Sequence, residues 1–127
     1  MTLRGPRSAM VAAAVCVLLV WAVPLAAHHS TTMFDTQKNI TLTGLVKRVE
    51  LKNPHSMFYV AVTDERGNAV EWILEAQPRG TLLQIGWTTM TLKAGDKVTF
   101  VGSPARNGKP FMWVRAIQLP DGRSLGT

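Results

Sequence analysis

The sequence predicts an all-β domain of five strands and one short helix, preceded by an N-terminal signal helix. An apolar N-terminal run that ends in small residues indicates the signal. Beyond it, segments rich in β-branched and aromatic residues alternate with turns that contain Gly, Asn or Pro, which is the pattern of a small β-protein. In a single stretch, residues 78–86, the apolar spacing changes to that of a helix.

The N-terminal segment has the three parts of a secretory signal peptide. Arg4 and Arg7 give a positive start, residues 9–23 are almost wholly apolar, and residues 24–27 end in small side chains. A membrane-spanning helix needs about 20 apolar residues, so this run is short for an uncleaved anchor, which is the alternative. We expect cleavage after Ala27, with cleavage one residue earlier as the second choice. The protein is then periplasmic or secreted, and it meets the membrane only through the signal segment during export.

Removal of residues 1–27 leaves one small domain without cysteine, because Cys16 belongs to the signal. A disulfide or a thiolate site is therefore not expected. Lysine and arginine outnumber aspartate and glutamate by 14 to 8 over the chain, and they are spread along it. This distribution lacks the basic cluster that nucleic-acid binding requires, so no nucleic-acid partner is expected.

The lead-in and the first strand come next. Residues 28–39 form a polar lead-in segment, in which Phe34 is expected to pin the chain to the core, and residues 40–127 form the barrel domain. The first strand, residues 40–51, alternates apolar residues with threonines until Gly44 interrupts the pattern. A glycine inside a strand often marks a bulge or a tight bend, as the long first strand of a closed barrel needs.

Two strands joined by a hairpin follow. Residues 53–56, Asn-Pro-His-Ser, have the chemistry of a turn. The second strand covers residues 57–64, a hairpin turn with a glycine covers residues 65–68, and the third strand covers residues 69–75. Glu71 and Glu75 fall on one face of that third strand, which we interpret as a solvated face.

The last part of the chain supplies the helix and two more strands. Pro78 suits the start of the helix and Gly86 its end. The fourth strand covers residues 97–102 and the fifth covers residues 111–119, with a second hairpin between them at residues 105–110. A further turn stands near the C-terminus.

The order β-β-β-α-β-β is that of the five-stranded OB-fold barrel, with a small sandwich or an SH3-like barrel as the alternative. The OB-fold binds ligands on the face of strands two and three, flanked by the loops that here are residues 53–56 and 105–110. Aromatic residues on this face stack on ligands, although the same residue types also fill cores. The candidate residues of this ligand face are Asn53, Tyr59, Trp72 and Arg106. Their expected partner is a small molecule or a protein.

Short motifs in a fixed order cover essentially the whole of residues 28–127. They are His28-His29-Ser30, Phe34-Asp35, Leu42-Thr43-Gly44, Asn53-Pro54-His55-Ser56, Glu71-Trp72, Gly86-Trp87 and Gly95-Asp96-Lys97-Val98. Together they resemble an uncharacterised family of small exported bacterial proteins that is catalogued as a domain of unknown function. The resemblance implies export and a small β-rich domain, and it implies no established activity.

The three histidines suggest a Cu(II) site. Cleavage after Ala27 makes His28 the first residue, so its amine and its imidazole can chelate one ion, while His55 or His29 supplies another imidazole. Nitrogen-rich, roughly square-planar sites suit Cu(II) or Ni(II). The arrangement is similar to the histidine brace of copper-binding periplasmic proteins and copper monooxygenases. In the alternative, the terminal histidines bind stray copper and His55 only hydrogen-bonds its own loop. The spacing matches no structural zinc pattern.

The sequence favours a non-enzymatic role. Its acidic residues are scattered, and it contains neither a nucleophile-elbow serine nor a glycine-rich phosphate loop. The expected function is therefore an exported binding or accessory module of unknown ligand. The alternative is a periplasmic Cu(II)-binding protein that uses the N-terminal histidine created by signal cleavage.

Overall fold

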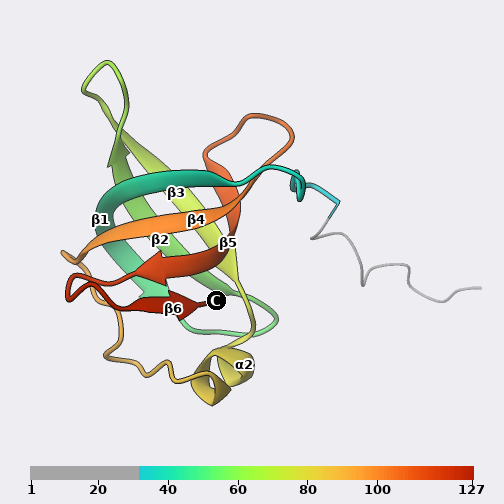
Figure 1. Cartoon of the computed structure of the whole chain (residues 1–127), viewed down its shortest axis with the longest axis vertical. Coiled ribbons are helices and arrows are strands. Elements are labelled where there is room, and N and C mark those ends of the chain that lie inside the picture. Colours follow the sequence, from blue (N-terminus) through green and yellow to red (C-terminus); the bar gives the residue numbers. More distant parts are fainter. Residues whose placement is uncertain (1–31) are drawn as a thin grey trace, which may run out of the picture.

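The computed structural model describes residues 32–127 and confirms the predicted all-β, OB-like barrel with one short helix (Figure 1). In chain order, the elements are β1 (Ile40–Glu50), β2 (Ser56–Thr63), β3 (Ala69–Ala76), α2 (Arg79–Gln84), β4 (Lys97–Pro104), β5 (Phe111–Gln118) and β6 (Ser124–Gly126). Each predicted strand is present, with bounds that differ by one or two residues. No helix within this part of the chain is long and apolar enough to cross a membrane.

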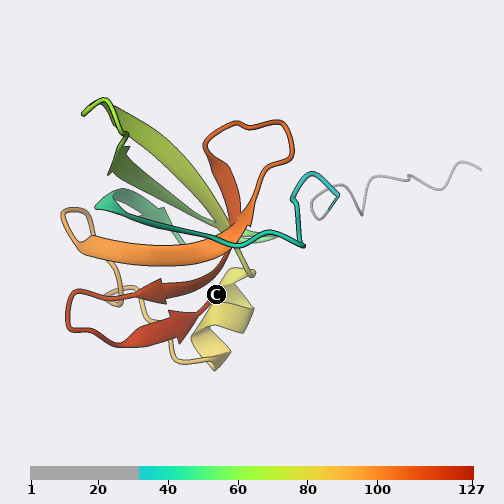
Figure 2. The same ribbon diagram turned by 45° about the horizontal axis from the view of Figure 1, so that its top comes forward.

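The strands close into a ring through one parallel pairing. The sheet order is β3-β2-β1-β4-β5-β6, with antiparallel neighbours, and β3 returns to pair in parallel with β5. This pairing, the seam of the barrel, joins Ile73 to Phe111 and Glu75 to Trp113. The seam covers residues 73–75 of β3, so the first half of β3 diverges from β5 as part of the projecting β2–β3 hairpin (Figure 2).

β6 was not expected from the sequence. It is three residues long and pairs with β5, with Leu125 opposite Ile117. Trp87, which follows α2, fixes it in place because the indole Nε1 donates a hydrogen bond to the Gly126 carbonyl at 2.8 Å. The same indole stacks on Phe58 of the core at 5.3 Å between ring centroids. The C-terminal strand and the segment after the helix are thus held to one side of the barrel.

The first strand bends around Gly44, as its sequence suggested. A Cβ atom at Gly44 would lie 2.4 Å from the carbonyl oxygen of Ala61, so a side chain does not fit where β1 crosses β2. The break in pairing lies a little further along, between Val46 and Arg48. Gly44 therefore permits the close approach of two strands, and the bulge follows it.

Strand alternation separates the barrel interior from its outer wall. In β2, Phe58, Val60 and Val62 are buried, whereas Tyr59 between them is partly exposed. Because successive residues of a strand point to opposite faces, Phe58 faces the interior and Tyr59 the outer wall. Inward residues of the other strands, together with Leu82 of α2 and Trp87, complete one continuous core. Such a core is the main stabilising feature of a small domain without disulfides.

The lead-in segment docks on the outside of the barrel. Asp35 donates its backbone N–H to the Pro104 carbonyl at 2.8 Å, and Arg106 donates its backbone N–H to the Met33 carbonyl at 2.8 Å. Phe34 is 1% exposed, as expected of an anchor. Its ring lies against Phe111 rather than within the barrel core, so the expected attachment to the core is corrected to attachment to the wall.

Candidate functional site

A second, smaller packed group covers the outer wall at the seam. We call it the outer-wall cluster, and its members are Phe34, His55, Glu75, Phe111 and Trp113. They come from four parts of the chain: Phe34 from the lead-in, His55 from the β1–β2 loop, Glu75 from β3, and Phe111 and Trp113 from β5. The register of the seam sets Glu75 beside Trp113, and alternation turns both side chains outward, away from inward-facing Leu74 and Met112. The cluster therefore exists because β3 and β5 meet.

His55 and Glu75 form an ion pair in this cluster. Nδ1 of His55 lies 2.5 Å from Oε1 of Glu75, and the Glu75 side chain is only 8% exposed. The imidazole stands edge-on to the Trp113 ring, with 5.4 Å between centroids and an angle of 86°. A buried carboxylate and an indole face thus fix the orientation of a histidine that is still 29% exposed.

Burial has an electrostatic consequence for Glu75. Desolvation raises the pKa of the Glu75 carboxyl above its ordinary value of 4.5, and the neighbouring His55 imidazole opposes part of that rise. The interpretation of the Glu71–Glu75 face as solvated is therefore wrong for Glu75, although it holds for Glu71, which is exposed. The cause is the seam, which lets Trp113 and the β1–β2 loop cover one end of that face.

The pair leaves one histidine nitrogen available. Because Nδ1 faces Glu75, Nε2 is the atom that remains for a ligand. Metal-ligating histidines commonly have this arrangement, in which a carboxylate on the second nitrogen fixes the ring and increases its basicity. Within residues 32–127, no three His, Cys, Asp or Glu side chains come together to hold a metal ion. The other predicted ligands, His28 and His29, lie outside the described residues.

The structure does not bring the four predicted ligand-face residues together. Tyr59 pairs with Ile73 on the outer wall, whereas Trp72 lies on the opposite, inward face. The Arg48 guanidinium covers the Tyr59 ring, 3.9 Å from its centroid. Arg106, in the β4–β5 loop, places Nη1 3.9 Å from Asp35 Oδ1. Asn53 is exposed in the turn before β2.

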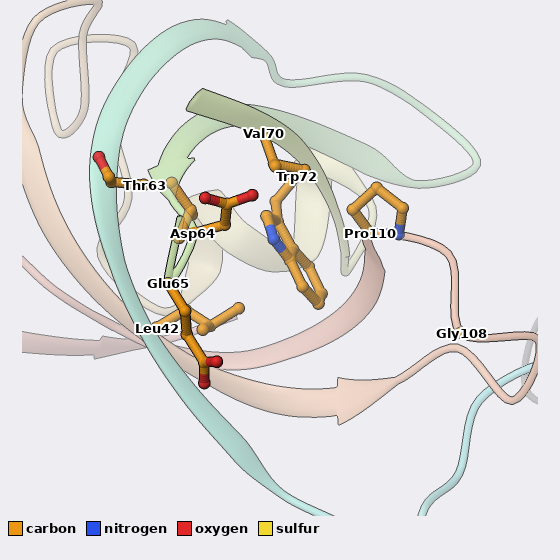
Figure 3. A pocket seen from close by; sticks show the side chains of 9 residues that line it. Leu42, Thr63, Asp64, Glu65, Val70, Trp72, Gly108 and Pro110 are labelled. Atoms are coloured by element: carbon orange, nitrogen blue, oxygen red, sulfur yellow. The ribbon is translucent and has the colours of Figure 1, made fainter. Parts of the chain in front are cut away.

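Trp72 belongs instead to a pocket where the seam ends. The pocket has a volume of about 400 Å³ and lies between the start of β3, the end of β2, β1 and the β4–β5 loop. Its lining is mostly apolar, and it consists of Leu42, Val62, Thr63, Asp64, Glu65, Val70, Trp72, Gly108 and Pro110. Figure 3 shows the Trp72 indole in the middle of these residues, with Leu42 and Glu65 to one side and Pro110 to the other. We call this the barrel-end pocket.

A second cavity borders the outer-wall cluster. Its volume is about 440 Å³, and its lining includes Met33 of the lead-in, Met57 and the exposed edge of Phe111. Met57 is directly opposite Glu75 in the β2–β3 pairing, so this groove runs beside the His55–Glu75 pair. Part of its wall is the docked lead-in segment.

The fold and these two sites define the chain as a small OB-like barrel with an apolar pocket at one end and a histidine–glutamate pair on its wall. It belongs to a family described as a family of unknown function (DUF6152), whose model matches residues 14–112. The resemblance noted from the sequence motifs is thereby confirmed. No curated protein matches the chain.

Proposed function

We propose that this protein is an exported, non-enzymatic binding module that holds a small molecule in the barrel-end pocket. The observation that carries the proposal is the cavity of about 400 Å³ around Trp72. Ligand pockets are mostly apolar, with a small number of polar groups that orient the ligand, and this cavity has that composition. The signal-like residues 1–27 support the export part of the proposal.

The position of the pocket also supports binding. Its walls are strand residues of β1, β2 and β3, which the barrel holds in fixed positions, and its rim includes the β4–β5 loop. A site built on strands requires little ordering when a ligand enters, so less binding free energy is lost. Trp72 offers a large half-buried surface to such a ligand.

A fragment screen on residues 28–127 tests this function. We expect bound fragments to shift the NMR signals of the Trp72 indole N–H and the Val70 methyl groups. Trp72→Ala should abolish the shifts of the Val70 methyl groups, whereas Trp113→Phe, a change on the outer wall, should preserve the shifts of both Trp72 and Val70. Binding that persists in Trp72→Ala, or shifts confined to other surfaces, would overturn the proposal. The mass of the protein recovered from an exporting cell tests the signal and its cleavage after Ala27.

We propose Cu(II) binding as a second function, because Glu75 holds His55 in the orientation of a metal ligand. Phe34, the anchor of the lead-in, lies 6.2 Å from Trp113 between ring centroids, and Trp113 lies 5.4 Å from His55. Phe34 is the sixth residue after His28. An extended chain covers about 3.3–3.6 Å per residue, so the terminal amine and the His55 ring are within reach of one ion.

Copper titration of the correctly processed protein tests this second function. We expect one Cu(II) ion to bind, with a loss of about tenfold or more in affinity when three residues are added before His28, because the chelating amine becomes an amide and no histidine then lies among the first three residues. His55→Ala should weaken the same site, and His29→Ala identifies whether the neighbouring imidazole takes part. Unchanged affinity in the extended protein would exclude the terminal chelate.

A further inference from the structure

We infer that the ligand of the barrel-end pocket is a small amphipathic cation, with an apolar ring-sized body and an ammonium group. The inference rests on the proposed binding function of this pocket and names the chemical class of its ligand. It follows from three features of the described residues: the apolar floor, the sign of the charges at the rim, and the indole between them (Figure 3).

The floor of the pocket requires an apolar partner. Val62 and Val70 stand opposite each other in the β2–β3 pairing, and Leu42 of β1 and Pro110 of the β4–β5 loop line the same cavity. A ligand that covers these side chains gains about 25 cal/mol for each Å² of apolar surface removed from water. A strongly hydrated ligand without an apolar part gains nothing from this floor.

The charged residues that line the pocket are both acidic. Asp64 and Glu65 stand at the rim, and no lysine or arginine is among the lining residues. This is notable in a chain with 14 basic and 8 acidic residues. The local charge of the rim is thus opposite to the net charge of the molecule, and it favours a positively charged ligand group over a negative one.

The two carboxylates have different roles. Oδ1 of Asp64 accepts the backbone N–H groups of Arg66 at 2.9 Å and Asn68 at 2.8 Å, so Asp64 is a fixed part of the turn. These bonds, with that from Asn68 first, lower the pKa of Asp64 and keep it negative. Glu65 takes part in no ion pair within residues 32–127, and its carboxylate is available to a ligand.

Trp72 connects the floor to the rim. An indole face attracts a cation within about 6 Å of its centre more strongly than phenylalanine or tyrosine does. In the close view, the indole lies between Pro110 on one side and Leu42, Asp64 and Glu65 on the other, so it borders both apolar and acidic side chains. A ligand with a ring on the floor and an ammonium group toward Glu65 therefore satisfies all three features at once.

Three probes of nearly equal shape test the inference: phenethylammonium, phenethyl alcohol and phenylacetate. Titrations followed by NMR on residues 28–127 should give the tightest binding for phenethylammonium, by about tenfold over the alcohol, and the weakest for phenylacetate. Glu65→Gln should weaken phenethylammonium roughly threefold and leave the alcohol unchanged. Added salt should weaken the cation alone.

The matched control is Glu71→Gln, which removes the same charge from an exposed site on β3 that does not line this pocket. It should leave all three affinities unchanged. Equal binding of amine and alcohol at Trp72, or tighter binding of phenylacetate, would overturn the cation inference and leave the pocket function standing. Failure of all three probes to shift Trp72 or Val70 would count against the pocket function itself.

Discussion

Glu75 and Trp113 stand side by side across the parallel seam that closes the barrel, and His55 contacts both of them. The β3–β5 pairing that closes the barrel therefore also positions the histidine–glutamate pair. A change that separates β3 from β5 would also release His55. A change in the pair is expected to weaken the seam.

The pair can be tested as a unit. His55→Ala leaves the Glu75 carboxylate buried without its partner, so we expect a loss of about 2 kcal/mol in the free energy of unfolding. The double variant His55→Ala/Glu75→Gln should be more stable than His55→Ala alone, because the neutral amide costs less to bury. Urea denaturation measures both, and Glu71→Gln is the control, with a change within about 0.5 kcal/mol. A double variant that is less stable than His55→Ala would contradict this account.

The pH dependence of stability isolates the Glu75 carboxyl. Its pKa is raised in the folded state above the ordinary 4.5, so the folded protein keeps a proton that the unfolded chain has already released. The stability contributed by Glu75 is therefore full below pH 4.5 and is lost as the pH rises through the folded pKa. Relative to Glu75→Gln, the wild-type protein should lose stability across this window. Urea midpoints of both proteins at several pH values check this, and a wild-type stability that rises with pH relative to that of Glu75→Gln would contradict it.

Gly44 should tolerate no side chain. Gly44→Ala places a Cβ atom 2.4 Å from the Ala61 backbone. Relief of this clash requires the backbones of two paired strands to move apart, so we expect destabilisation of about 2–3 kcal/mol. Gly80→Ala is the matched control, because nothing lies within 4 Å of its Cβ position in α2. Alanine is the better helix former there by up to about 1 kcal/mol. Thermal denaturation of the two variants should thus shift in opposite directions.

Phe34 should control the docking of the lead-in segment. Phe34→Ala removes an almost fully buried ring, a change that typically costs about 3–5 kcal/mol in a core. Here the loss is expected to be local, because Phe34 lies outside the barrel core. Hydrogen exchange at the Asp35 and Arg106 amides should accelerate while that of the core strands stays slow. Met33→Ala, at a residue that is 38% exposed, is the control.

The strand order could be predicted because its signals are local. Alternating apolar residues, the Gly67 and Gly108 turns and the Pro78 helix start all act over a few residues. β6 was missed because three residues carry no period, and its position depends on Trp87, which is distant in sequence.

The candidate sites depend on contacts between residues that are far apart in the sequence, and no local sequence pattern predicts such contacts. His55 was singled out from its turn, but its partner Glu75 is set by the seam, which joins segments almost 40 residues apart (from Ile73 to Phe111). Tyr59 and Trp72 were grouped because their strands are neighbours. The register, with Val60 opposite Trp72, places them on opposite faces. The length of the turn between β2 and β3 sets this register. The faces of Tyr59 and Trp72 could therefore be predicted only once that length was known.

The short seam also bears on solubility. It leaves residues 69–72 of β3 without a strand partner on that side among the described residues, and an unpaired strand edge can recruit a second molecule. The adjoining hairpin carries Glu65 and Arg66 in an exposed turn. Strand addition would have to remove water from such charged side chains, which makes this edge a poor template for aggregation.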